Sequence, residues 1–152
     1  MNIFVLDVQL RISVQYHCNK HVVKMPLEAA QIGSTVVGGP YKPTHANHPC
    51  TVWARESRSN LVYVLAYGYE LCVEYTHRYG KRHKCEEVLR ECYDLRHRIP
   101  DIGQTPHPQC MPEQYKRPDV VDAYRAYYIG EKHDILQYTN RDTPSWLYEE
   151  VI

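Results

Sequence analysis

The sequence predicts a mainly α protein, an irregular single-domain helical bundle with long proline-rich loops. Three observations support this fold class. A chain of 152 residues is most simply one domain, here residues 1–152, built around one core. Apolar residues recur at helical spacing in several stretches, whereas no stretch shows the alternation of a sizeable sheet. Prolines and glycines gather in residues 33–49 and 99–118, which we expect to be loops.

The elements are expected in the following order. Asn2–Leu6 is a short apolar run, either a short N-terminal strand or an extended lead-in. A helix is expected from Leu10 to about Ile32, with a kink or break at Pro26, because proline removes one backbone hydrogen bond and clashes with the preceding turn. Further elements are expected over 51–79 (one helix or a pair, with Gly68 a weak point and Gly80 a C-cap), 83–97 and 119–138, with Trp146 docking the tail.

Charge and cysteine usage narrow the classes of function. The 18 basic and 18 acidic residues cancel, which argues against a broad non-specific DNA coat but not against a local basic groove. The six cysteines include no CxxC pair and follow no secretory signal, so we expect reduced thiols in a cytosolic protein. No apolar run is long enough to span a bilayer, and we expect no membrane partner.

A polar strip on the first predicted helix is the main candidate site. If the segment is helical, its members share one face between two apolar sectors: His17, His21, Lys24, Glu28 and Gln31, with Lys20 at the edge. One interpretation is a solvated face that carries an ordinary Lys24–Glu28 ion pair. We favour the other interpretation, the wall of a binding or catalytic site, because an ion pair does not account for two histidines one turn apart.

The loop and helix start at residues 42–57 form a second concentration of functional groups. His45 and His48 flank Asn47, and Thr51 is a candidate N-cap for the helix that follows. Helix N-termini bind anions, and this one is accompanied by cationic and aromatic side chains, Lys42, Arg55, Arg58, Tyr41 and Trp53. The segment therefore predicts a pocket for a phosphorylated base, or else a rigid loop whose polar side chains satisfy backbone groups.

A zinc site is chemically possible but is not what we expect. Its ligands would come from the two concentrations, His17, His21, His45, His48 and Cys50. Lys20 and Lys24 lie alongside and would oppose a cation, and no HExxH motif is present. We therefore predict no metal and no cofactor. A separate basic segment, residues 78–84, supplies Lys81 as a further candidate phosphate ligand.

Several strings resemble a family of small, functionally uncharacterised proteins of tailed bacteriophages, including T4-like phages and cyanophages. They are HCNKHVVKM, THANHPCTVW, EYTHRYGK, MPEQYK and AYRAYYIGEK, and the resemblance covers nearly the whole chain. It implies a phage gene product that works in the host bacterial cytoplasm, where DNA or nucleotide metabolism and counter-defence are common functions. Pro26 departs from the family pattern, in which an aliphatic residue is usual.

A looser resemblance is to the pyrimidine-dimer glycosylases, which are also small, helical and phage-borne. In that group a carboxylate on an early helix assists attack by the N-terminal amine. Glu28 is similar in position to that carboxylate, but Asn2 is not the small second residue that would expose a free amine. The glycosylase mechanism is therefore not carried over to this sequence.

These observations favour an enzyme that acts on a nucleotide or nucleic-acid base. The predicted acid–base groups are His17, His21, Glu28, His45 and His48, and the predicted ligand-binding groups are Lys20, Lys24, Asn47, Trp53, Arg55 and Lys81. The alternative is a non-catalytic binder that sequesters a nucleotide signal or inhibits a host defence protein. The alternative predicts that the ligand is recovered chemically unchanged. The oligomeric state is not predicted.

Overall fold

All regular elements in the described part of the chain are helical. The computed structural model describes residues 1–148, in which no strand occurs, so the mainly α prediction is confirmed and Asn2–Leu6 is an extended lead-in. The α-helices are α1 (Leu10–Gln15), α2 (Asn19–Val37), α3 (Pro49–Glu56), α4 (Arg58–Tyr79), α5 (Glu86–Asp94) and α6 (Val120–Glu131). Short 3₁₀ turns occur at Arg96–Arg98, Glu113–Tyr115, His133–Ile135 and Ser145–Leu147. Within residues 1–148 no helix combines the length and apolarity needed to cross a membrane.

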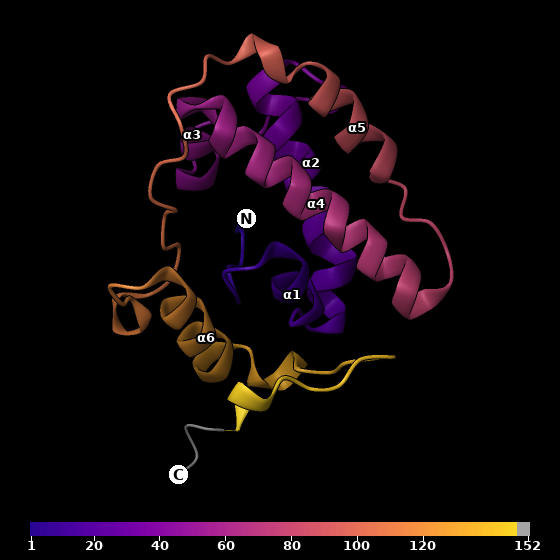
Figure 1. Cartoon of the computed structure of the whole chain (residues 1–152), viewed down its shortest axis with the longest axis vertical. Helices are drawn as coiled ribbons and strands as arrows, with labels where there is room; N and C mark the ends of the chain where they lie inside the picture. Colours follow the sequence, from indigo (N-terminus) through magenta and orange to yellow (C-terminus); the bar gives the residue numbers. More distant parts are fainter. Residues whose placement is uncertain (149–152) are drawn as a thin grey trace.

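Helices α2 and α4 form the centre of the fold, and α5 packs against both of them (Figure 1). Their close approach depends on glycine. A Cβ atom on Gly68 of α4 would lie 2.8 Å from the Cβ of Ala29 on α2 and 2.8 Å from a methyl group of Leu89 on α5. Gly68 was expected to be a weak point of its helix, but α4 is unbroken there, because the missing side chain is what allows three helices to meet.

The first predicted helix is divided, but not at the expected place. The prediction of a kink or break at Pro26 is corrected to an interruption at residues 16–18, and α2 runs continuously through Pro26. Tertiary contacts hold the interruption, since the Asn19 amide donates to the carbonyl of Gln137 at 2.8 Å. Pro26 is buried, so packing of α2 offsets the loss of one backbone hydrogen bond. Helix α2 also continues past Ile32 to Val37, and Gly38, whose φ is +73°, is its C-cap.

The later elements follow the prediction with shorter helices. The expected segment 51–79 is a pair of helices, α3 and α4, and Gly80 caps α4 with φ +70°. Helix α5 is shorter than the predicted 83–97. Helix α6 begins after Asp119, whose side chain accepts hydrogen bonds from two backbone amides, and stops at Glu131 instead of Tyr138. Trp146 is 6% exposed and packs against Tyr16 and Tyr128, as predicted for the tail.

The N-terminal segment lies inside the molecule. Figure 1 shows the N-terminus between α2 and α4 on one side and α6 on the other. Ile3, Phe4, Val5 and Leu6 are all buried in the single core that the helices share. The chain therefore starts in the interior, and the first helix begins only after the chain has left it.

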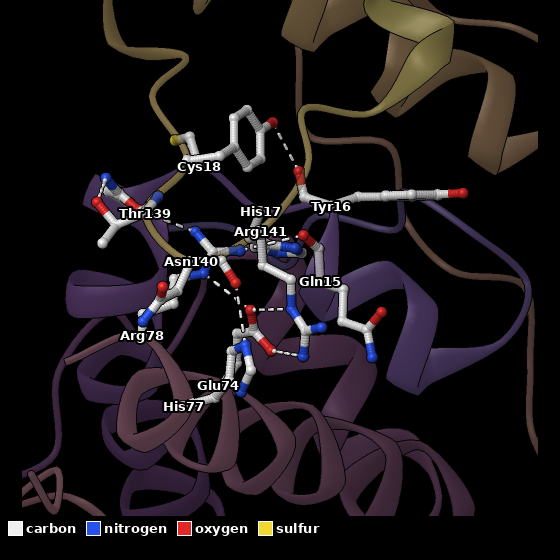
Figure 2. Close-up of polar contacts among 12 residues, drawn as sticks. Gln15, Tyr16, His17, Cys18, Glu74, His77, Arg78, Thr139, Asn140 and Arg141 are labelled. Atoms are coloured by element: carbon white, nitrogen blue, oxygen red, sulfur yellow. Dashed lines mark hydrogen bonds and ion pairs between the residues drawn. The ribbon is translucent and has the colours of Figure 1, made fainter. Parts of the chain in front are cut away.

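A buried ion cluster joins the C-terminal segment to the helices (Figure 2). The Glu74 carboxylate accepts from Arg78 at 2.8 Å and from two nitrogens of Arg141 at 2.9 Å each. The Arg78 guanidinium also donates to the Gln15 carbonyl and to the Asn19 side chain, both at 3.1 Å. One carboxylate on α4 thus connects the α1–α2 junction to the tail.

We expect Glu74→Gln to destabilise the protein by about 3 kcal/mol, because the change leaves Arg78 buried without its partner. Burial alone would raise the pKa of Glu74, but the hydrogen bonds and charges of Arg141 and Arg78 outweigh it and lower the pKa. The contribution of Glu74 to the free energy of unfolding is fully present above the ordinary pKa of 4.5, and it is lost as the pH falls through the lowered pKa of the folded protein. Urea unfolding from pH 7 to pH 3 measures it.

Glu91→Gln, at an exposed position of α5, is the matched control and should leave the stability unchanged. An E74Q protein as stable as the wild type, with the same pH dependence, would contradict this account of the cluster.

Candidate active site at the buried amino terminus

The Met1 nitrogen and the Glu28 carboxylate form an ion pair in the interior. The Met1 nitrogen lies 3.5 Å from Oε1 of Glu28, and the carboxylate side chain is 8% exposed. The Asn2 amide donates to the same oxygen at 2.9 Å. The Lys24 ammonium lies 3.8 Å from Oε2, and its side chain is largely exposed. Glu28 thus holds the first two nitrogens of the chain on one oxygen and a surface cation on the other.

The second proline-rich loop covers this pair. The Asn2 side chain donates to the carbonyl of Cys110 at 2.8 Å and accepts from the Tyr124 hydroxyl at 2.8 Å. His107, in the same loop, contacts the Ile3 carbonyl at 3.2 Å through Nε2. These bonds fix the direction in which the chain enters the core and place the Met1 nitrogen against Glu28.

Three side chains with metal-binding atoms gather beside the Met1 nitrogen. One ligand atom from each of His48, Cys50 and Cys110 lies within 4.8 Å of the others, and the two sulfurs are 3.6 Å apart. Burial lowers the pKa of His48, whereas the hydrogen bond to Cys110 and burial raise the pKa of Cys50, and the charge of the N-terminal amine acts in the lowering direction on all three groups. The pKa of Cys110 is lowered overall, chiefly because the Cys50 thiol donates a hydrogen bond to it.

Comparison with known families gives a match over residues 1–87, to the model of the family described as pyrimidine dimer DNA glycosylase. This is more than half of the chain. The protein belongs to the pyrimidine dimer DNA glycosylase family. The match contains Met1, Glu28, His48 and Cys50, but it ends before Cys110. No curated protein and no solved structure matches the chain.

Family membership revises the two resemblances found in the sequence. The looser one, to the pyrimidine-dimer glycosylases, is confirmed as the family, although the identity of Asn2 had counted against its mechanism. The narrower resemblance to uncharacterised phage proteins, with its bacterial host, stays a prediction. In the structure it is the Met1 nitrogen that lies beside Glu28, 3.5 Å from Oε1.

His17 and His21 of this family member lie in the core, not on a polar strip with Lys24. His17 precedes α2 and is 0% exposed, with Nδ1 2.7 Å from the Ser13 carbonyl and Nε2 2.8 Å from the Tyr67 hydroxyl. His21 is 6% exposed and contacts the Tyr128 hydroxyl at 2.6 Å. The expectation of one helical face is therefore corrected: the interruption at residues 16–18 turns His17 inward, and only Glu28 and Lys24 meet.

The predicted pocket in residues 42–57 is only partly assembled. Trp53 was expected to stack on a base, but it is 3% exposed and packs edge-on against His107, so this expectation is corrected. His48 caps α3, accepting from the Cys50 amide at 3.1 Å, a role that had been considered for Thr51. The remaining candidates are exposed side chains, His45, Asn47, Arg55, Lys20 and Lys81. Arg55 donates to the Ala46 carbonyl, which ties it to its own loop.

Sequence reasoning missed the Met1 nitrogen, Asn2 and Cys110 as members of the site. Asn2 and Cys110 are 108 positions apart and meet only because the second loop crosses the N-terminal segment. The one available signal was the similarity of Glu28 to a glycosylase carboxylate, which points to the first nitrogen of the chain.

We expect His17 and His21 to remain neutral between about pH 5 and pH 8, because burial lowers the pKa of each ring from 6.5 to about 3. Since the unfolded chain takes up these protons below pH 6.5, the two rings make stability fall as pH drops through that value. NMR titration of the ring protons checks this, with the urea-unfolded protein as the control. Titration near pH 6.5 in the native protein would contradict the burial of these rings.

Proposed function

We propose that this protein is a DNA glycosylase whose N-terminal amine attacks the sugar of the target nucleotide. One observation carries the proposal: in a member of this family, the Met1 nitrogen lies 3.5 Å from a carboxylate that is almost closed to solvent. Family membership supports an enzyme that acts on nucleic-acid bases. The geometry adds a nucleophile and an acid–base partner in contact with each other.

The chemistry follows from these two groups. Glu28 takes a proton from the Met1 ammonium, and the freed lone pair attacks C1′ of the sugar. The bond from C1′ to the base breaks, and the base leaves with the bonding electrons and takes a proton from Glu28, which restores the carboxylate. The C1′–O4′ bond of the sugar ring then breaks, its electrons go to O4′, and O4′ takes a proton from the attached amine, which leaves a protonated imine between the amine and C1′. The negative charge of the restored Glu28 carboxylate stabilises this positive charge, and water hydrolyses the imine to restore the amine.

The position of Asn2 makes the site tolerant of N-terminal processing. In the proposed mechanism Met1 supplies the amine, since its nitrogen lies 3.5 Å from Oε1 of Glu28. If Met1 were removed, the new terminal nitrogen would be that of Asn2, which lies 2.9 Å from the same Glu28 oxygen. In either form a terminal nitrogen contacts Glu28.

We infer that the exposed lysines of α2 bind the phosphates on either side of the target nucleotide. Lys20, Lys24 and Glu28 are four residues apart and share one face of the helix, with Lys24 3.8 Å from the carboxylate. A DNA strand whose phosphates bind Lys20 and Lys24 runs along α2 toward Glu28. This accounts for a DNA-binding protein with zero net charge, because the cations need to be local.

We expect borohydride to trap the protein covalently on DNA that contains its target lesion, through reduction of the imine. Glu28→Gln should lower the rate of trapping by at least about 100-fold, because acid–base assistance is lost. Intact mass and peptide mapping of the trapped complex should place the adduct on the terminal amine. Oligonucleotides that carry an abasic site, a pyrimidine dimer or an alkylated base identify the lesion.

Glu91→Gln, the same chemical change on the exposed face of α5, is the control and should trap at the wild-type rate. Reductive methylation restricted to the α-amine should abolish trapping. Trapping on a lysine side chain, or DNA recovered unchanged from every substrate, would refute the proposed nucleophile. The second result would favour the non-catalytic binder.

We expect Lys20→Gln to weaken DNA binding for every sequence tested and to reduce the slope of log affinity against log salt by about one, because one phosphate contact is lost. Fluorescence anisotropy from low to moderate salt measures both effects. Arg90→Gln, which removes one positive charge at an exposed position of α5, is the control. An unchanged salt slope for K20Q would rule out the phosphate contact.

A further inference from the structure

We propose that His48, Cys50 and Cys110 form a binding site for a thiophilic divalent metal of the zinc class, beside the N-terminal amine. Each side chain offers one ligand atom, and the three atoms lie within 4.8 Å of one another. Two sulfurs and an imidazole nitrogen are the ligands that zinc prefers among protein groups. The site is separate from the proposed glycosylase chemistry, which needs no metal.

The sulfur positions agree with a tetrahedral metal. With zinc–sulfur bonds of about 2.3 Å, two thiolates on one tetrahedral ion lie about 3.8 Å apart. The observed separation between the sulfurs of Cys50 and Cys110 is 3.6 Å. A disulfide would require about 2.05 Å, so the pair is closer to the arrangement that a shared metal imposes than to a covalent bond.

The elements that carry the ligands are well placed to hold them. His48 and Cys50 stand at the start of α3, and Cys110 is fixed by its amide, which donates to the Tyr124 hydroxyl at 3.2 Å, and by its carbonyl, which accepts from Asn2. Cys50 is completely buried. The three ligands are therefore brought together by the same bonds that position the N-terminus.

Metal binding has one identifiable structural cost. Nδ1 of His48 accepts a hydrogen bond from the Cys50 amide and so caps α3. A neutral imidazole has a single free lone pair, so ligation by either ring nitrogen ends this capping bond. Three metal–ligand bonds outweigh one capping bond, and the Cys50 amide becomes a local reporter of the exchange.

The charges around the site allow a cation with two thiolates. The Met1 amine and Lys116 are the positive groups that influence Cys110, and the Glu28 carboxylate influences His48. Two thiolates neutralise a divalent ion, so the positive neighbours face no added net charge. The three protein ligands leave a fourth tetrahedral position for water.

The experiment uses the whole reduced protein without DNA. Zinc titration against a chromogenic chelator should give one tight site, and cobalt should give the near-ultraviolet charge-transfer band of thiolate ligands. Cys110→Ala, Cys50→Ala and His48→Gln should each lower the zinc affinity by at least about 100-fold. Cys72→Ala, a buried cysteine outside the cluster, is the matched control and should bind zinc as the wild type does.

A measurement on the wild-type protein tests the metal site even if the variants fail to fold. Bound zinc should protect Cys50 and Cys110 from alkylation, as read by peptide mass mapping, and should shift the NMR signal of the Cys50 amide. Zinc binding that survives loss of either cysteine, or the absence of a thiolate band, would overturn the proposal. An intact mass lower by two hydrogens, with Cys50 linked to Cys110, would replace the metal site with a disulfide. Since none of these readouts involves DNA, failure of the metal site is distinguishable from failure of the glycosylase.

Discussion

Residues 1–6 enter the core as an extended chain without a strand partner, and the rest of the fold is arranged around this constraint. Buried backbone groups must be paired, and here side chains from distant elements pair them. Oxygens of Glu28, Tyr67 and Ser13 accept from the amides of Asn2, Phe4 and Leu6, whereas His107 and Arg125 contact the carbonyls of Ile3 and Leu6. Because these partners come from every part of the chain, the helices close around the segment, and the terminal nitrogen is carried to the interior.

The same constraint explains the character of the site. A buried carboxylate needs compensation, and Glu28 receives it from the Met1 nitrogen and the Asn2 amide. The bonds that stabilise Glu28 in the core also hold it against the proposed nucleophile, the Met1 nitrogen. The contacts that stabilise Glu28 are therefore the same contacts on which its proposed catalytic role depends. The hydrogen bonds among Asn2, Tyr124 and the second loop hold both the Met1 amine and Cys110, the partner of Cys50, in position.

The sequence was sufficient for the fold class and for most elements, because helical periodicity, caps and proline clusters are local signals. Gly80 and Asp119 were read correctly for this reason. The division of the first helix was placed wrongly, since Pro26 is a local signal whereas the interruption at residues 16–18 is held by contacts to the tail. Glu28 and His48, two of the predicted catalytic residues, lie in close clusters of polar groups, and their catalytic roles stay a prediction. The pairing of Glu28 with Met1 and of Cys50 with Cys110 depends on long-range closure of the fold, which no local signal predicts.

The unusual content of 14 tyrosines and one phenylalanine now has a physical account. Tyr67, Tyr124 and Tyr128 are fully buried. Their hydroxyls accept from the backbone amides of Phe4, Cys110 and Cys18, all in irregular segments. A phenylalanine would fill the same space but leave these amides unpaired. A fold that buries irregular chain among helices therefore needs large side chains that also form hydrogen bonds. The three buried tyrosines meet this need at Phe4, Cys18 and Cys110.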